Sequence, residues 1–158
     1  PYLYGGPIAS AIAHMKYDPS PHLAQGLGKL MCAAWPGGDF DLVVPVPLHR
    51  DRLVRRGFNQ AALLAGVLAR NRALALETNA LRRTRDSEAQ VGKDRASRLE
   101  DLKGAFCIKG KPEVFAKKRV LLVDDVVTTT ATARSAAKTL KKAGGADSVT
   151  VMCLARAT

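Results

Sequence analysis

The sequence has 158 residues, the size of one domain, and 47% of them are apolar while only 5% are aromatic. Lysine and arginine number 25 against 14 acidic residues, so the formal net charge is +11. A charge this large favours anionic partners such as phosphates, nucleotides or nucleic acid over a role in solubility alone. No apolar run approaches the roughly 20 residues that span a bilayer, and no secretory signal is visible, so we expect a cytoplasmic protein without a membrane span.

The cysteines and histidines predict no metal site built from these side chains. The three cysteines are far apart and have apolar neighbours, which predicts buried, reduced thiols: Cys32, Cys107 and Cys153. The histidines cluster neither with them nor with each other, so zinc is not expected. His49 is expected to be a surface or hydrogen-bonded loop residue rather than a catalytic one.

In the first half of the chain, two helices are expected over residues 7–17 and 21–35, the second stopped by a Pro-Gly-Gly run. Residues 41–47 form an apolar run that predicts a buried strand, with its two prolines near a strand end. A basic loop is expected over 48–58, and Asn59 is a plausible N-cap for a helix over 60–72.

In the second half, a weak strand is expected near 76–83 and another over 104–108. Between them, residues 84–103 are polar and charged, which predicts either a mobile functional loop or a partly helical segment near 95–101. Strands over 120–123 and 148–154 enclose a helix over 129–143 that ends at Gly144-Gly145. Continuous apolar strands alternating with helices predict an α/β fold, a parallel sheet with helices on both faces.

The stretch from Val120 to Thr132 carries the most chemical information. Four apolar residues are followed by the acid pair Asp124-Asp125, and four threonines then stand among the five residues 128–132. The start of a helix offers unpaired N–H groups to a phosphate, and threonine hydroxyls add donors. A carboxylate pair can accept hydrogen bonds from the hydroxyls of a ribose or hold a hydrated Mg²⁺. The stretch therefore predicts a ribose 5-phosphate site, with an ordinary capped strand-to-helix turn as the structural alternative.

This stretch resembles the phosphoribosyl pyrophosphate signature of type I phosphoribosyltransferases, and the chain resembles their competence-associated ComF group. Three further segments carry that resemblance: Val44 to His49 with Arg55 to Gln60, Gln90 through Arg98 to Phe106, and Lys16-Tyr17. The resemblance implies the type I phosphoribosyltransferase fold, with a small N-terminal helical hood over residues 1–40 and a core over 41–158.

The resemblance also implies roles for individual residues. Asp124 and Asp125 would be catalytic, binding the ribose hydroxyls and Mg²⁺, with Arg98 in a lid formed by residues 84–98. The binding site for phosphoribosyl pyrophosphate, or for a ligand like ribose 5-phosphate, would include the acid pair and the residues Val127, Thr128, Thr129, Thr130, Ala131 and Thr132. The pyrophosphate would meet Val46, Pro47, Arg50, Arg52 and Arg56. The expected activity is transfer of the phosphoribosyl group to an unidentified acceptor, a step of nucleotide metabolism.

Two features depart from the family pattern. Family members usually have glycine where this chain has Thr130, and a β-branched residue would be strained at positive φ. A rearranged loop or a weakened phosphate site is therefore expected. The four-cysteine zinc ribbon that often begins ComF proteins is missing and Pro1 is not Met, so we expect an upstream segment to have been lost or removed.

A second reading is a binding protein on the same scaffold. ComF-type proteins are associated with competence and DNA uptake, and Lys138, Lys141 and Lys142 gather near one helix face. Such faces are compatible with single-stranded DNA, beside a regulatory or vestigial phosphate site, although a solvated surface explains them equally well. The oligomeric state is left open, with a dimer as one option.

Overall fold

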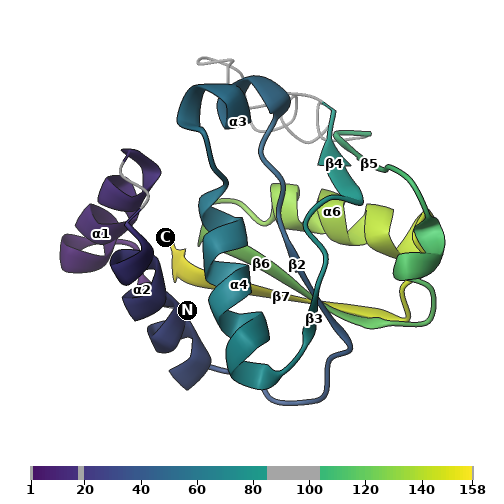
Figure 1. Cartoon of the computed structure of the whole chain (residues 1–158), viewed down its shortest axis with the longest axis horizontal. Helices are drawn as coiled ribbons and strands as arrows, with labels where there is room; N and C mark the ends of the chain where they lie inside the picture. The colour runs from purple at the N-terminus through teal and green to yellow at the C-terminus, as the bar shows by residue number, and fades with distance from the viewer. Residues whose placement is uncertain (1, 18–19, 85–103, 158) are drawn as a thin grey trace.

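The computed structural model of the protein describes residues 2–17, 20–84 and 104–157. Its main sheet has five parallel strands in the order β1-β7-β6-β2-β3 (Figure 1). The central strands are β2 (Leu42–Pro45), β6 (Arg119–Val127) and β7 (Ser148–Arg156), and two-residue strands at the edges are β1 (Tyr2–Leu3) and β3 (Ala75–Leu76). The predicted parallel sheet is confirmed, whereas β1 was not predicted.

Strand β6 is longer than the sequence suggested. Its apolar run was expected to end at Val123, but pairing with β7 continues as far as Val127, which lies opposite Arg156. The acid pair Asp124-Asp125 therefore belongs to the strand itself. At the other end of β6, Asp41 accepts hydrogen bonds from the backbone N–H and the guanidinium of Arg119. These bonds hold the pKa of Asp41 well below its usual range.

Helices cover both faces of the sheet (Figure 1). On one face, α1 (Gly6–Tyr17), α2 (Pro21–Ala33) and α4 (Gln60–Arg72) share a core cluster with Leu121 and Val123 of β6. On the other face, α6 (Ala131–Lys142) packs with Val120 and Leu122. Successive strand residues point to opposite faces, so the alternating apolar positions of β6 supply both clusters.

The helix boundaries follow local sequence signals. The Ser20 hydroxyl caps α2 by accepting the N–H of Leu23, and Asn59 caps α4 as predicted by accepting the N–H of Ala61. Where α2 crosses α4, a Cβ added to Gly28 would lie 2.5 Å from a methyl carbon of Val67. The two helices therefore approach closely because residue 28 has no side chain.

The predicted basic loop over residues 48–58 is wrong, because most of it is the short helix α3 (Arg50–Arg56). The Nδ1 atom of His49 accepts the N–H of Asp51 at 3.4 Å and caps the helix. Gly57 ends it at φ 79°, a conformation that favours glycine. His49 is thus a capping residue, in line with the expectation that it hydrogen-bonds locally.

A small sheet of two antiparallel strands stands beside α6. It pairs β4 (Leu81–Arg83) with β5 (Phe106–Ile108), and a 3-10 turn, η1 (Pro112–Val114), follows. The single strand predicted near 76–83 is thus divided between β3 and β4, which belong to different sheets. The lid expected over 84–98 lies almost entirely outside the described residues, and Arg98 with it.

The cysteines match the prediction only in part. All three thiols are free, but Cys107 is exposed, because alternation along β5 turns it away from its buried neighbour Phe106. Cys32 and Cys153 are half-buried, and burial raises the pKa of both thiols. Across residues 2–17, 20–84 and 104–157, no helix is both long and apolar enough to cross a membrane.

Candidate phosphate and ribose site

The carboxyl ends of β2 and β6 lie side by side at one edge of the sheet. Pro45 is in register with Val123, and the N–H of Val46 donates to the carbonyl of Val123 at 2.8 Å. A pocket of about 440 Å³ opens beyond these ends. Ligands of open parallel sheets bind at such an edge.

Most of the residues predicted for the site line this one pocket. From the segment after β2 and from α3 come Val46, Pro47, Arg52 and Arg56. From β6 and the turn after it come Asp124, Asp125, Val127, Thr128, Thr129 and Thr132. Of the predicted residues that the structure describes, three do not line it, namely Arg50, Thr130 and Ala131, and Arg98 lies outside the described residues. The pocket thus gathers segments that are about 70 residues apart in sequence, as the ribose 5-phosphate hypothesis requires.

Asp125 is the more deeply held of the two acids. Its side chain follows Val123 onto the face covered by α1 and α4, and the residue is only 5% exposed. Its Oδ2 atom accepts a hydrogen bond from Nε2 of Gln60 at 3.2 Å. The same oxygen lies 3.7 Å from Nζ of Lys16 in α1. A buried carboxylate is stable only when such partners compensate its charge, and here they come from two different helices.

The network continues from Gln60 toward the pocket mouth. Its Oε1 atom accepts a hydrogen bond of 2.6 Å from the guanidinium of Arg56 in α3. Gln60 therefore uses its amide in both directions, donating to the acid and accepting from the arginine. This chain of contacts fixes Arg56 relative to Asp125.

Asp124 is half-buried and occupies a different position. Adjacent strand residues point to opposite faces, so Asp124 follows Leu122 toward the α6 side. Its Oδ1 atom accepts the backbone N–H of Asp125 at 2.9 Å. Both acids nevertheless line the same pocket, because β6 ends there and the pocket reaches around the sheet edge.

Threonines surround the start of α6. The hydroxyl-bearing residues Thr128, Thr129 and Thr132 line the pocket, and Thr128 and Thr129 are exposed. Thr130 stands at the N-cap with φ −69° and ψ −2°, and its side chain makes no capping hydrogen bond. The backbone strain considered for a non-glycine residue here is thus absent, because Thr130 is in the helical region rather than at positive φ.

The turn geometry of α3 decides which arginines reach the pocket. Arg52 and Arg56 are four residues apart and share one helix face, which lines the pocket. Arg50 is exposed and stands apart from this lining. Among the described residues, the pocket has four cationic side chains against two carboxylates: Lys16, Arg52, Arg56 and Arg83. The excess of positive charge suits an anionic ligand.

Asn59 positions the segment that follows β2. Its Nδ2 atom donates to the carbonyl of Val46 at 3.1 Å while its Oδ1 atom caps α4. Asn59 had been predicted only as a cap, and Gln60 and Lys16 only as parts of family-like segments. Their roles depend on contacts across the fold, so no local pattern could have assigned them.

Comparisons with curated proteins give three informative relatives. The chain is 38% identical to competence protein F of Haemophilus influenzae over 117 residues, which are 74% of this chain and 51% of that protein. It is 32% identical to DNA utilization protein YhgH of Escherichia coli over 97% of this chain and 69% of that protein. It is 36% identical to competence protein ComFC of Streptococcus pneumoniae over 66% of this chain and 43% of that protein. The chain therefore spans only about half the length of the first of these relatives. No protein-family model matches it.

Solved structures with the same fold are phosphoribosyltransferases. The glutamine phosphoribosylpyrophosphate amidotransferase from B. subtilis superposes with a TM-score of 0.55 at 22% identity, over 83% of this chain and 26% of that one. The adenine phosphoribosyltransferase from Thermoanaerobacter pseudethanolicus superposes with a TM-score of 0.56 at 18% identity, over 87% of this chain and 70% of that one. The fold predicted from the sequence is thereby confirmed.

Proposed function

Because the chain belongs to the ComF family, we propose that it binds phosphoribosyl pyrophosphate with Mg²⁺ and transfers the phosphoribosyl group to an acceptor. The single observation that carries the proposal is the shared pocket of Asp124, Asp125 and the threonines at the start of α6. A phosphorylated pentose presents a phosphate at one end and a cis-diol at the other. The pocket offers donors for the first and carboxylates for the second.

In this proposal the 5-phosphate lies at the turn before α6. Thr128, Thr129 and Thr132 donate from their hydroxyls, and the first N–H groups of the helix add donors at the positive end of its dipole. Thr130 does not line the pocket and is assigned no contact with the phosphate. The pyrophosphate lies toward Arg52 and Arg56, which neutralise its charge.

Mg²⁺ fits the pocket as an ion shared with the ligand. Within the described residues, no group of three or more acidic, histidine or cysteine side chains is placed to hold a metal by itself. Mg²⁺ commonly uses one or two carboxylates and takes its remaining oxygens from substrate phosphates and water. Lys16 beside Asp125 disfavours a second cation there, so Asp124 is the better metal-facing carboxylate.

The chemistry assigned to these residues is mainly electrostatic. When bound, Mg²⁺ takes up negative charge on the departing pyrophosphate. Asp125, held by Gln60 and Lys16, accepts from a ribose hydroxyl and orients the sugar. The arginines of α3 stabilise the negative charge that develops on the pyrophosphate as the C1–O bond breaks. A preorganised carboxylate of this kind lowers the barrier by positioning the sugar before reaction.

Calorimetry tests the proposal directly. Phosphoribosyl pyrophosphate with Mg²⁺ is titrated into the wild type, into Asp124→Asn and into Asp147→Asn, an exposed acid outside the pocket. Binding heat in the wild type and the Asp147 variant, with at least about tenfold weaker binding in Asp124→Asn, is expected. Absence of heat in a folded wild type would refute the proposal.

Single-stranded DNA binding is the second candidate. It is favoured by the net charge of +11 and by relatives named for competence and DNA utilization. In this case the affinity for an oligothymidine falls steeply with added salt, because lysines and arginines displace counterions from phosphates. An affinity that does not change with salt would count against it. Together with the calorimetry, this salt titration distinguishes a DNA-binding protein from an enzyme.

A further inference from the structure

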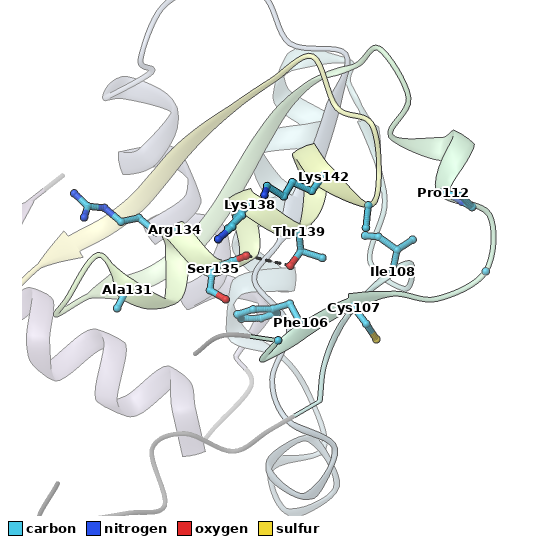
Figure 2. Close-up of a pocket in the computed structure, with 13 residues that line it drawn as sticks. Phe106, Cys107, Ile108, Pro112, Ala131, Arg134, Ser135, Lys138, Thr139 and Lys142 are labelled. Carbon is cyan, nitrogen blue, oxygen red and sulfur yellow. Dashed lines mark hydrogen bonds between the residues drawn. The ribbon is translucent and has the colours of Figure 1, made fainter. Parts of the chain in front are cut away.

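A second, larger hollow lies between β5 and α6 (Figure 2). Its volume is about 870 Å³, and none of the residues that line it lines the ligand pocket. We call it the α6 groove. Its walls are the outer face of α6 and the strand β5 with the segment that follows it.

One wall of the α6 groove carries a basic ridge. Arg134, Lys138 and Lys142 recur at intervals of four residues along α6, so they follow one another on one helix face about 6 Å apart. All three are exposed. Among the residues that the structure describes, no acidic side chain forms an ion pair with them. The three side chains are therefore available to an anionic partner.

The other wall offers an open strand edge. The N–H of Thr84 donates to Ala105 and the N–H of Lys109 donates to Ala80. In an antiparallel pair, hydrogen-bonded and non-hydrogen-bonded positions alternate, so the backbone groups of Phe106 and Ile108 point away from β4. In the described parts of the chain, no other strand pairs with β5. Such an edge accepts an additional strand.

The chemistry of the groove favours a peptide over a nucleic acid. Stacking of bases needs an exposed aromatic face, but Phe106 is only 5% exposed and the Arg83 guanidinium lies over its ring. Phosphates can accept from the N–H groups of a strand edge, but they offer no donor to its carbonyls. An extended peptide supplies both donors and acceptors, and its acidic side chains can meet the ridge.

We propose that the α6 groove is a docking site for an extended acidic segment of a partner protein, which adds a strand to β5. Its carboxylates pair with the ridge, and its backbone pairs with Phe106 and Ile108. The side chains between the acids point to the opposite face of the added strand. No side chain that lines the groove also lines the ligand pocket, although Ala131 adjoins that pocket as the first residue of α6.

The probe is a fluorescein-labelled octapeptide of alternating Glu and Val, which places its carboxylates on one face of an extended chain. Binding is followed by fluorescence anisotropy at physiological ionic strength. The test variant is Arg134→Glu/Lys138→Glu/Lys142→Glu. The matched control, Lys29→Glu/Lys118→Glu/Lys141→Glu, changes the net charge equally at exposed positions outside the groove. Circular dichroism verifies that both variants are folded.

The peptide is expected to bind the wild type and the control, and to bind the ridge variant at least about tenfold more weakly. The hydrogen exchange of the Phe106 and Ile108 amides slows when the peptide is bound. A peptide N-methylated at every residue loses affinity, because none of its amides can donate to the strand edge. A general attraction between opposite charges would produce neither of the last two effects.

Three outcomes would overturn the proposal. One is equal loss of peptide binding in the ridge and control variants, which would indicate unspecific charge attraction. Another is an oligothymidine that binds tightly at the ridge while the peptide does not, which would assign the groove to nucleic acid. The third is self-association in sedimentation that only the ridge variant abolishes, which would assign the groove to a second copy of the chain.

Discussion

Gln60→Leu tests whether the buried amide organises the acid pair. The side chain donates to Oδ2 of Asp125 at 3.2 Å and accepts from Arg56 at 2.6 Å. Leucine has a similar size but can do neither. Since Gln60 and Asp125 are each only 5% exposed, water cannot easily replace the lost donor.

The expected loss of stability is about 1–4 kcal/mol. Leaving a buried carboxylate without one of its donors costs about 1–3 kcal/mol, because the group keeps its desolvation penalty. The bond to Arg56 adds less than about 1 kcal/mol, since that guanidinium is only part-buried and can recruit water. For a domain of this size, the sum lowers the melting temperature by roughly 2–16 °C.

Urea denaturation and thermal melting measure this loss, with Asn71→Leu as the control. Asn71 is an exposed amide on the same helix, so its replacement changes stability by less than about 0.5 kcal/mol. The double variant with Asp125→Asn gives the coupling, which we expect to be about 1 kcal/mol or more. A Gln60→Leu protein as stable as the wild type, or strictly additive single effects, would refute the role of the amide.

Gly28→Ala should lower the free energy of unfolding by about 1–3 kcal/mol, although alanine has the better helix propensity, because the added methyl group meets Val67. The control Gly26→Ala lies on the open face of the same helix and should raise the free energy of unfolding by up to about 1 kcal/mol. Urea denaturation measures both. Asp41→Asn should lower the urea midpoint by an amount that is constant at neutral pH. That difference shrinks as the pH falls below about 4. The lowered pKa of Asp41 contributes its full stability only above the pKa of this group in the unfolded state, and the contribution is lost as the carboxylate is protonated. A difference that persists in acid would contradict the assignment. Thr130→Gly should change ligand affinity less than about twofold in calorimetry, because residue 130 has φ −69° and no strain to relieve.

The sequence was sufficient for the alternation of strands and helices, because continuous apolar runs, caps and glycine stops are local signals. It failed at α3, where four arginines in seven residues leave no apolar period and the helix depends on the His49 cap and on Gly57. It also placed the end of β6 too early. Charged residues usually end a buried strand, and here Asp125 stays within it because partners from α1 and α4 compensate its charge.

The site could be predicted in its membership more than in its geometry. The acid pair and Thr128, Thr129 and Thr132, which line the pocket, were predicted because their composition is unusual for a turn. The choice among the arginines needed the face of α3, since only Arg52 and Arg56 of the predicted three line the pocket. Gln60 is 65 residues from Asp125 in sequence, so its contact exists only once the sheet has brought α4 over β6.

The two acids are therefore not interchangeable, although they are neighbours of the same type. Alternation along β6 turns Asp125 toward α1 and α4, where Gln60 and Lys16 hold it, and turns Asp124 toward α6. A ligand that bridges both acids must reach around the edge of the sheet, with one end fixed by the held carboxylate. Lys16 links α1 to that same carboxylate, so any movement of α1 changes the electrostatic environment of the pocket. We therefore expect ligand affinity in this pocket to depend on the position of α1 as well as on the strand that carries the acids.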